Sequence, residues 1–268
     1  MLDSPRDLKV NDNYRPVVIP EFKLERVKEN APMNILCRDL NADKDGIPGY
    51  IAHPARKEPG PGILIVHHHY GVTGHLKAVT CDFAKLGYTT VALGIYKLLG
   101  EADGVHEAQK KTTDGQFVEV IQRGWRYLNR RNDVAPKRCA VVGYCMGGRI
   151  GIHFVAATPD VRSFVGYYPS VRDEGSSQLR PRHPNDAVKD FKCPSLIFFG
   201  GNDHVASVAV QDRLKTSFHA NGQPLDWHFF QHAGHGFALG DGDCYDPRLA
   251  GLAWTITSEF LERELETE

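Results

Sequence analysis

The sequence lacks several features that would assign it directly to a class of protein. Its 268 residues contain 32 Lys and Arg against 33 Asp and Glu, so it has no basic excess of the kind that binds nucleic acid or an anionic membrane surface. It also has no apolar run of the roughly 18 residues that a membrane-spanning helix needs. The first residues are polar and form no apolar signal core, so we expect a cytoplasmic protein.

The cysteines are few and contain no CxxC pair. This excludes a zinc ribbon or a disulfide framework as the organising principle of the fold. In a reducing compartment we expect free thiols, most of them buried as small hydrophobic groups and one of them reactive. The six cysteines are Cys37, Cys81, Cys139, Cys145, Cys193 and Cys244.

The chain divides into an N-terminal extension, residues 1–32, and one domain, residues 33–268. The extension is charged and rich in proline, and we expect it to lie on the surface of the domain. The remaining 236 residues are enough for one sizeable core, and their composition of 41% hydrophobic and 24% charged residues is typical of a globular protein.

Within the domain, short apolar runs alternate with helical patterns. Gly62–Val66 and Thr89–Leu93 are continuously apolar or β-branched, which is typical of strands buried on both faces. Residues 112–129 have apolar side chains at steps of three and four, which predicts an amphipathic helix. The alternation predicts an α/β fold with a mostly parallel sheet and helices on both faces. The other predicted strands are 33–37, 47–52, 139–142, 163–168, 195–199 and 225–230, and the other predicted helices are 76–86, 146–157, 205–219 and 249–265, with a loop at 170–185.

Cys145 stands in the pattern Gly-Tyr-Cys-Met-Gly, directly between a predicted strand and a predicted helix. This is the nucleophile elbow, in which a nucleophile occupies a strained turn and both flanking glycines are required because neighbouring backbone crowds them. The N-terminus of the following helix also favours a thiolate. The alternative is a buried cysteine after a strand, but the strand–turn–helix context favours a nucleophile.

An acid and a histidine follow in the order that this arrangement requires. Asp203 comes just after the predicted strand 195–199, and His235 follows the next predicted strand. Catalytic groups gather at the carboxyl ends of parallel strands, so we expect Cys145, Asp203 and His235 to converge. His232 and Asn202 are the weaker alternatives for the base and the acid.

These motifs resemble the dienelactone hydrolase family of α/β-hydrolases. The resemblance rests on the Gly-Tyr-Cys-Met-Gly-Gly elbow, the Gly-x-x-Asp loop and the Gly-His-x-Phe-Ala segment that starts at Gly234, and it extends from about Met33 to the C-terminus. It implies an α/β-hydrolase fold and a Cys145–His235–Asp203 triad that cleaves esters or lactones without a metal.

The residues suggest the same chemistry independently. His235 takes or shares the thiol proton, and Asp203 fixes its tautomer and stabilises the imidazolium. The thiolate attacks a carbonyl to give a thioester acyl-enzyme, which water hydrolyses. We expect the oxyanion to bind the backbone N–H groups of Met146, next to the nucleophile, and of His69, in the loop after the third strand.

The sequence departs from the family pattern at two positions. His68 stands where the family commonly has a glutamate that interacts with the thiol, so His68 is expected to contact either the thiolate or the substrate. Leu239 stands where dienelactone hydrolases have an arginine for the substrate carboxylate. We therefore expect a neutral or aromatic ester rather than a small anionic lactone. The predicted pocket residues are His68, Tyr70, Tyr144, Phe237 and Leu239.

Three consecutive histidines, His67, His68 and His69, raise the possibility of a metal site. On a strand only His67 and His69 would share a face, so two ligands at most would come from this segment, and we expect no metal and no other cofactor. The predicted partner is a small-molecule ester or lactone, with the chain a monomer or a homodimer.

Other functions remain open on the same fold. One alternative is a non-catalytic ligand-binding or redox-sensing protein in which Cys145 is the sensitive thiol. Another is a thioesterase or a phosphotriester hydrolase that uses the same triad, because specificity depends on loops that the fold does not determine.

Overall fold

A computed structural model describes residues 34–100, 108, 110–173 and 175–266. The predicted extension at 1–32 lies outside these residues. The strands are β1 (Ile35–Leu40), β2 (Gly49–Pro54), β3 (Gly60–Val66), β4 (Thr89–Leu93), β5 (Val134–Tyr144), β6 (Ser163–Tyr167), β7 (Ser195–Asn202) and β8 (Leu225–Gly234). The helices are α1 (Ala42–Asp45), α2 (Gly74–Lys85), α3 (Ile95–Leu98), α5 (Asp114–Asn129), α6 (Met146–Ala156), α7 (Pro184–Ala187), α8 (Val208–Ala220) and α9 (Pro247–Glu266).

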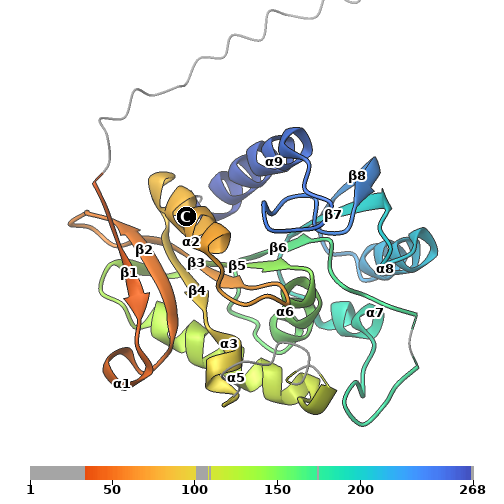
Figure 1. Ribbon diagram of the computed structural model, residues 1–268, viewed down its shortest axis with the longest axis horizontal. Helices are drawn as coiled ribbons and strands as arrows, with labels where there is room; N and C mark the ends of the chain where they lie inside the picture. The colour runs from red at the N-terminus through yellow and green to blue at the C-terminus, as the bar shows by residue number, and fades with distance from the viewer. Residues whose placement is uncertain (1–33, 101–107, 109, 174, 267–268) are drawn as a thin grey trace, which may run out of the picture. The chain divides into compact units, whose positions relative to one another are not determined.

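The strands form one sheet of eight in the order β1-β2-β4-β3-β5-β6-β7-β8. β1 and β2 are antiparallel to their neighbours. The other six strands, β4, β3, β5, β6, β7 and β8, are parallel to one another. Helices α2 and α9 pack on one face of the sheet, and α5 and α6 pack on the other (Figure 1). The predicted α/β fold, with a mostly parallel sheet and helices on both faces, is confirmed.

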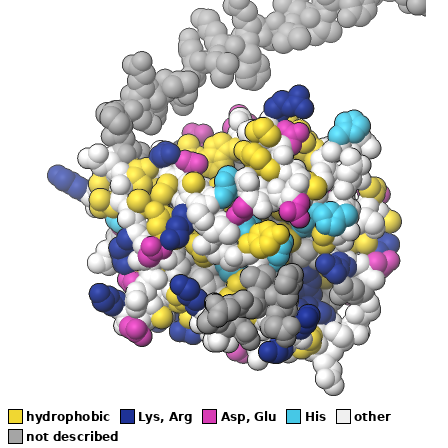
Figure 2. Space-filling model, in the orientation of Figure 1, with side chains coloured by type: hydrophobic (Ala, Val, Ile, Leu, Met, Phe, Trp, Pro, Cys, Tyr) yellow, Lys and Arg dark blue, Asp and Glu magenta, His cyan; other side chains and the backbone are white. Residues whose placement is uncertain are grey.

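The core lies between the sheet and these helices. Every residue of β4 and β6 is buried, as expected of central strands covered on both sides. Helix α5 begins with a capping box in which Thr113 and Gln116 each bind the other's backbone N–H, and its apolar side faces the core. Over the described surface in Figure 2, acidic and basic side chains are interspersed, in keeping with the balanced charge. The described helices include none that is long and apolar enough to cross a membrane.

Several boundaries differ from the sequence predictions for local reasons. Helix α8 starts at Val208, not at residue 205, because the carboxylate of Asp203 accepts the backbone N–H groups of Val205 and Ala206. Strand β8 continues to Gly234, four residues beyond its predicted end. The short helices α1 and α3, of four residues each, fall in segments with no helical prediction, because one turn is too short to show a period.

The register of the sheet places the ends of its parallel strands side by side. Val66 of β3 pairs with Gly143 of β5, and Tyr144 pairs with Tyr167 of β6. Asn202 of β7 pairs with Gly234 of β8. The loops that follow these strands therefore open on one edge of the sheet, where we locate the candidate site.

Candidate active site

Cys145 occupies the turn between β5 and α6 with φ 52° and ψ −114°, a conformation that costs a non-glycine residue about 1–3 kcal/mol. Its backbone N–H donates to the carbonyl of Tyr167, and its carbonyl accepts the N–H of Ser170. The flanking glycines are required by space: a Cβ at Gly143 would overlap the carbonyl oxygen of Gly147, and a Cβ at Gly147 would overlap that of Val66. This is the strained turn that the elbow pattern predicts.

His235 and Asp203 form a buried pair beside this turn. The Nδ1 atom of His235 lies 3.0 and 2.9 Å from the two carboxylate oxygens of Asp203. The Asp203 side chain is fully buried and His235 is 8% exposed. Nδ1 therefore donates to the carboxylate, which leaves Nε2 of His235 as the atom available to the thiol. Nε2 is buried, and the thiol of Cys145 interacts with the ring.

The thiol and the imidazole shift each other's pKa. Burial alone would raise the pKa of Cys145, but interaction with His235 and with His69 outweighs it and lowers the pKa to about 6. Burial would lower the pKa of His235, but Asp203 and Cys145 outweigh it and raise the pKa to about 9. At neutral pH the site therefore favours a thiolate paired with an imidazolium.

The alternatives for acid and base lie elsewhere. His232 lies in the exposed part of β8, where its carbonyl accepts a hydrogen bond from the side chain of Asn202. Asn202 is itself exposed. Neither side chain lines the cavity that contains Cys145.

The three histidines after β3 have three different environments. β3 ends at Val66, so the strand alternation expected for them does not apply, and His68 and His69 both line the cavity while His67 is fully buried behind it. Both ring nitrogens of His67 are occupied, Nδ1 by the carbonyl of His68 and Nε2 by the N–H of Ile95. The Nδ1 atom of His69 lies 4.0 Å from the sulfur of Cys145. The side chain of His69 therefore contacts the thiol of Cys145.

The side chain of His68 faces Asp241, an acidic residue that was not predicted from the sequence. Its Nδ1 accepts the backbone N–H of Tyr70, so the neutral ring has its proton on Nε2. Nε2 lies 3.3 Å from a carboxylate oxygen of Asp241. Burial lowers the pKa of His68, which favours the neutral ring, although Asp241 opposes the shift. Asp241 follows His235 by six residues, in a loop with no strand or helix pattern that would have placed it.

The cavity at Cys145 has a volume of about 280 Å³. Of the predicted pocket residues, His68, Tyr70 and Leu239 line it. The predictions for Tyr144 and Phe237 are wrong. The Tyr144 ring is buried and stacks on Tyr167 at 4.6 Å between ring centroids, and Phe237 is fully buried against Tyr168. Both side chains belong to the core that supports the site.

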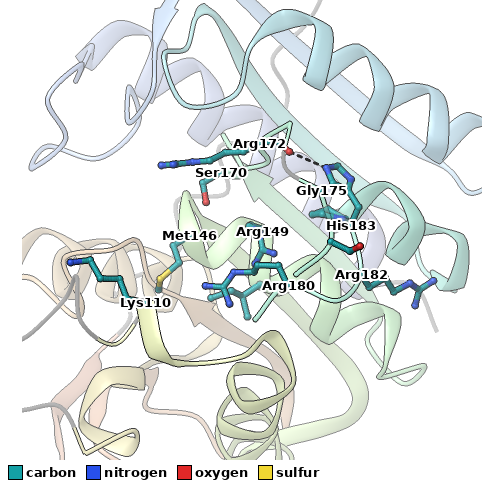
Figure 3. A pocket seen from close by; sticks show the side chains of 12 residues that line it. Lys110, Met146, Arg149, Ser170, Arg172, Gly175, Arg180, Arg182 and His183 are labelled. Atoms are coloured by element: carbon teal, nitrogen blue, oxygen red, sulfur yellow. Dashed lines mark hydrogen bonds between the residues drawn. The ribbon is translucent and has the colours of Figure 1, made fainter. Parts of the chain in front are cut away.

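A second cavity of about 390 Å³ adjoins the first and is basic. Met146, Ser170 and Arg172 line both cavities, and Figure 3 shows them beside Arg149 and Arg180. The carboxylate of Asp114 pairs with Arg149 at 2.7 Å and with Arg180 at 3.4 Å. Arg172 and Arg180 come from the loop after β6, whose charged composition was the only sequence signal for them. Among the described residues, no group of three or more His, Cys, Asp or Glu side chains is arranged to hold a metal ion.

Residues 47–265 match the model of the dienelactone hydrolase family. The chain belongs to that family. It is 34% identical over 228 residues to a predicted carboxymethylenebutenolidase of Methylorubrum extorquens, covering 82% of this chain and 78% of that protein. It is 24% identical to a predicted 2-oxo-3-(5-oxofuran-2-ylidene)propanoate lactonase of Bradyrhizobium, covering 85% and 93% of the two chains.

Solved structures of similar proteins share the fold. A crystal structure of a predicted dienelactone hydrolase from Klebsiella pneumoniae has a TM-score of 0.78 at 22% identity, with 85% of this chain and 98% of that chain covered. A dienelactone hydrolase-like promiscuous phosphotriesterase from metagenomic libraries has a TM-score of 0.70 at 14% identity, covering 86% and 98%. Because the present chain belongs to the dienelactone hydrolase family, it is a hydrolase of lactone or ester bonds.

Proposed function

We propose that the protein hydrolyses a carboxylic ester or lactone through a Cys145–His235–Asp203 triad and a thioester acyl-enzyme. The observation that supports this most directly is the geometry: Cys145 stands at a strained turn and shares a cavity with His235, whose Nδ1 is held by the buried carboxylate of Asp203. In keeping with this, His235 and His69 lower the pKa of Cys145 to about 6. A thiolate that forms below neutral pH is a ready nucleophile, and the paired imidazolium is a ready acid.

The reaction proceeds in two steps. The Cys145 thiolate adds to the substrate carbonyl, and the His235 imidazolium gives its proton to the departing alkoxide, which leaves a thioester. Neutral His235 then takes a proton from water as the water attacks the thioester, and the Cys145 thiolate leaves, which releases the carboxylic acid and restores the thiolate–imidazolium pair. Asp203 holds the Nδ1–H of the imidazole throughout.

We place the oxyanion at the backbone N–H groups of Met146 and His69. Met146 is the first residue of α6, where backbone N–H groups have no acceptor within the helix. The carbonyl of His69 accepts the hydroxyl of Tyr96, which orients this loop, and the same hydroxyl contacts the sulfur of Met146. These contacts hold the loop of His69 against the start of α6, which supports this proposal, because electrostatic stabilisation of an oxyanion requires fixed donors.

The proposed substrate is a neutral ester or lactone rather than a small anionic one. The cavity wall contains Leu239, and it contains two carboxylates, Asp241 and Asp243, against one arginine, Arg172. Asp241 is half-buried and Asp243 is exposed, and carboxylates in the cavity wall disfavour a substrate with a charge of the same sign. Arg172 and the basic cavity beside it favour the opposite preference, for a substrate that bears a carboxylate. Values of kcat/KM for neutral and anionic substrates distinguish the two preferences.

The test compares the wild type with Cys145→Ala on a panel of neutral aryl esters, neutral lactones and carboxylate-bearing lactones, with acyl-enzyme trapped for mass spectrometry. We expect an adduct on the peptide that contains Cys145 and loss of turnover in the variant. Equal turnover in both proteins without an adduct contradicts the nucleophile, and binding without any turnover favours a sensing protein. Comparable kcat/KM for the neutral ester and the anionic lactone contradicts the substrate preference.

A further inference from the structure

Three polar side chains in the wall of the catalytic cavity have atoms without hydrogen-bond partners. Nε2 of His68, the hydroxyl of Tyr168 and both carboxylate oxygens of Asp241 are buried and make no well-formed hydrogen bond, although Nε2 of His68 and Oδ1 of Asp241 face each other at 3.3 Å. His68 is 5% exposed and Tyr168 is 1% exposed. Buried polar atoms are normally satisfied, because each unpaired one costs about 1–3 kcal/mol. Such a group in a cavity wall therefore points to a ligand.

Local contacts hold these groups toward the cavity. The backbone N–H of Tyr70 occupies Nδ1 of His68, so the proton of the neutral ring lies on Nε2, 3.3 Å from Asp241. Tyr168 follows β6 in a strained conformation, with φ 36°, and its ring lies between those of His235 and Phe237 at 5.1 and 5.2 Å. Neither group turns away without breaking these contacts.

The three side chains present a matched set of donors and acceptors. The N–H of His68 can only donate, the carboxylate of Asp241 can only accept, and the hydroxyl of Tyr168 can do either. A hydroxyl group satisfies them, because it donates to Asp241 and accepts from His68 or Tyr168. A carbonyl or ether leaves Asp241 unpaired, and a carboxylate meets it with like charge.

We propose that His68, Tyr168 and Asp241 form a subsite for a hydroxyl group of the substrate, so that the enzyme selects hydroxylated neutral esters or lactones. This deepens the proposed function and rests on it, since the same cavity must admit the substrate of Cys145. The subsite determines specificity and takes no part in bond making or breaking.

The test measures binding rather than turnover, so that it is independent of the nucleophile. Calorimetry on the wild type compares phenylacetamide with its ortho-, meta- and para-hydroxy forms, which mimic the acyl side. It also compares N-benzylacetamide with its three hydroxybenzyl forms, which mimic the leaving group. We expect at least one hydroxylated amide to bind about tenfold more tightly than its parent, the effect of one good hydrogen bond to a charged group.

Variants then assign that preference to the subsite. In Asp241→Ala we expect the Kd values of the parent and the hydroxylated amide to agree within about twofold. Asp241→Asn should give an intermediate ratio of the two Kd values, because an amide oxygen still accepts a hydrogen bond. Tyr168→Phe weakens the preference without changing the ring. Asp243→Asn, a neighbouring carboxylate of the same cavity wall, is the matched control and retains the preference.

Two outcomes overturn the inference. If no hydroxylated amide binds more tightly than its parent, the subsite holds water only. If the preference persists in Asp241→Ala, other groups recognise the hydroxyl. Failure of the proposed function looks different: Cys145→Ala then retains turnover, while the binding preference in the wild type is unaffected.

Discussion

Replacing Asp203 with asparagine removes the charge from the Asp203–His235 pair and leaves the surrounding loop in place. Oδ1 of Asp203 accepts the backbone N–H groups of Val205 and Ala206 at 2.8 and 2.9 Å, and an asparagine oxygen can keep both bonds. The amide nitrogen then replaces Oδ2, 2.9 Å from Nδ1 of His235. Oδ1, 3.0 Å from Nδ1, already accepts two N–H groups, so two donors face each other at the amide nitrogen unless the imidazole moves its proton to Nε2. With its proton on Nε2 the ring can no longer accept the thiol proton.

The size of the effect follows from the hydrogen bond that is lost. A hydrogen bond to a charged group contributes about 1.5–3 kcal/mol, and each 1.4 kcal/mol is a factor of ten, so formation of the thiolate–imidazolium pair becomes about 10- to 150-fold less favourable. The pKa of Cys145 accordingly rises from about 6 to roughly 7–8. Deacylation slows as well, because His235 no longer activates water.

The assay is the rate of alkylation of Cys145 by iodoacetamide as a function of pH, followed by mass spectrometry of its peptide. Peptide mapping separates this thiol from the five other cysteines of the chain. Asp212→Asn is the control and retains the wild-type profile, since Asp212 is exposed on α8 and does not line the cavity. A folded Asp203→Asn protein with the wild-type profile refutes the reasoning.

Three further predictions concern the site and its support. For the wild type, a plot of kcat/KM against pH should be bell-shaped, with its limbs at about pH 6 and about pH 9. Below about pH 6 Cys145 gains a proton, and above about pH 9 His235 loses one. A kcat/KM that keeps rising through pH 9 contradicts this prediction. Gly147→Ala should fail to fold or melt well below the wild type, since the new Cβ overlaps the backbone at the end of β3; a normal melting temperature and activity contradict the packed elbow. Asp114→Asn should lower the free energy of unfolding by about 1–3 kcal/mol, because it leaves the partly buried charges of Arg149 and Arg180 without their carboxylate. No change in urea denaturation would count against the role of this ion pair.

The fold and the positions of the three proposed triad residues could be predicted from local sequence. Continuous apolar runs such as Thr89–Leu93 predict buried strands because strands covered on both faces have no polar side. The glycines around Cys145 identify a strained turn because backbone crowding leaves no room for a Cβ. Chain order and strand ends then bring Asp203 and His235 to the same edge of the sheet.

The cavity wall could not be predicted in this way. Tyr144 and Phe237 adjoin the predicted triad in sequence, yet both rings turn into the core, because neighbouring residues of a strand or turn point to different sides. Asp241 and Arg172 lie in loops, where no period relates sequence position to direction. The strand alternation also failed for His67, because β3 ends one residue before it.

The sequence by itself predicted the residues that we propose for the chemistry, because a nucleophile elbow, an acid after a strand and a histidine between glycines are local patterns that backbone geometry enforces. Only the tertiary structure decided what surrounds them. It placed the side chain of His69 4.0 Å from the thiol, His68 against Asp241 and a basic cavity beside the catalytic one. Those contacts join loops far apart in the chain, and their directions depend on how the whole sheet brings the loops together.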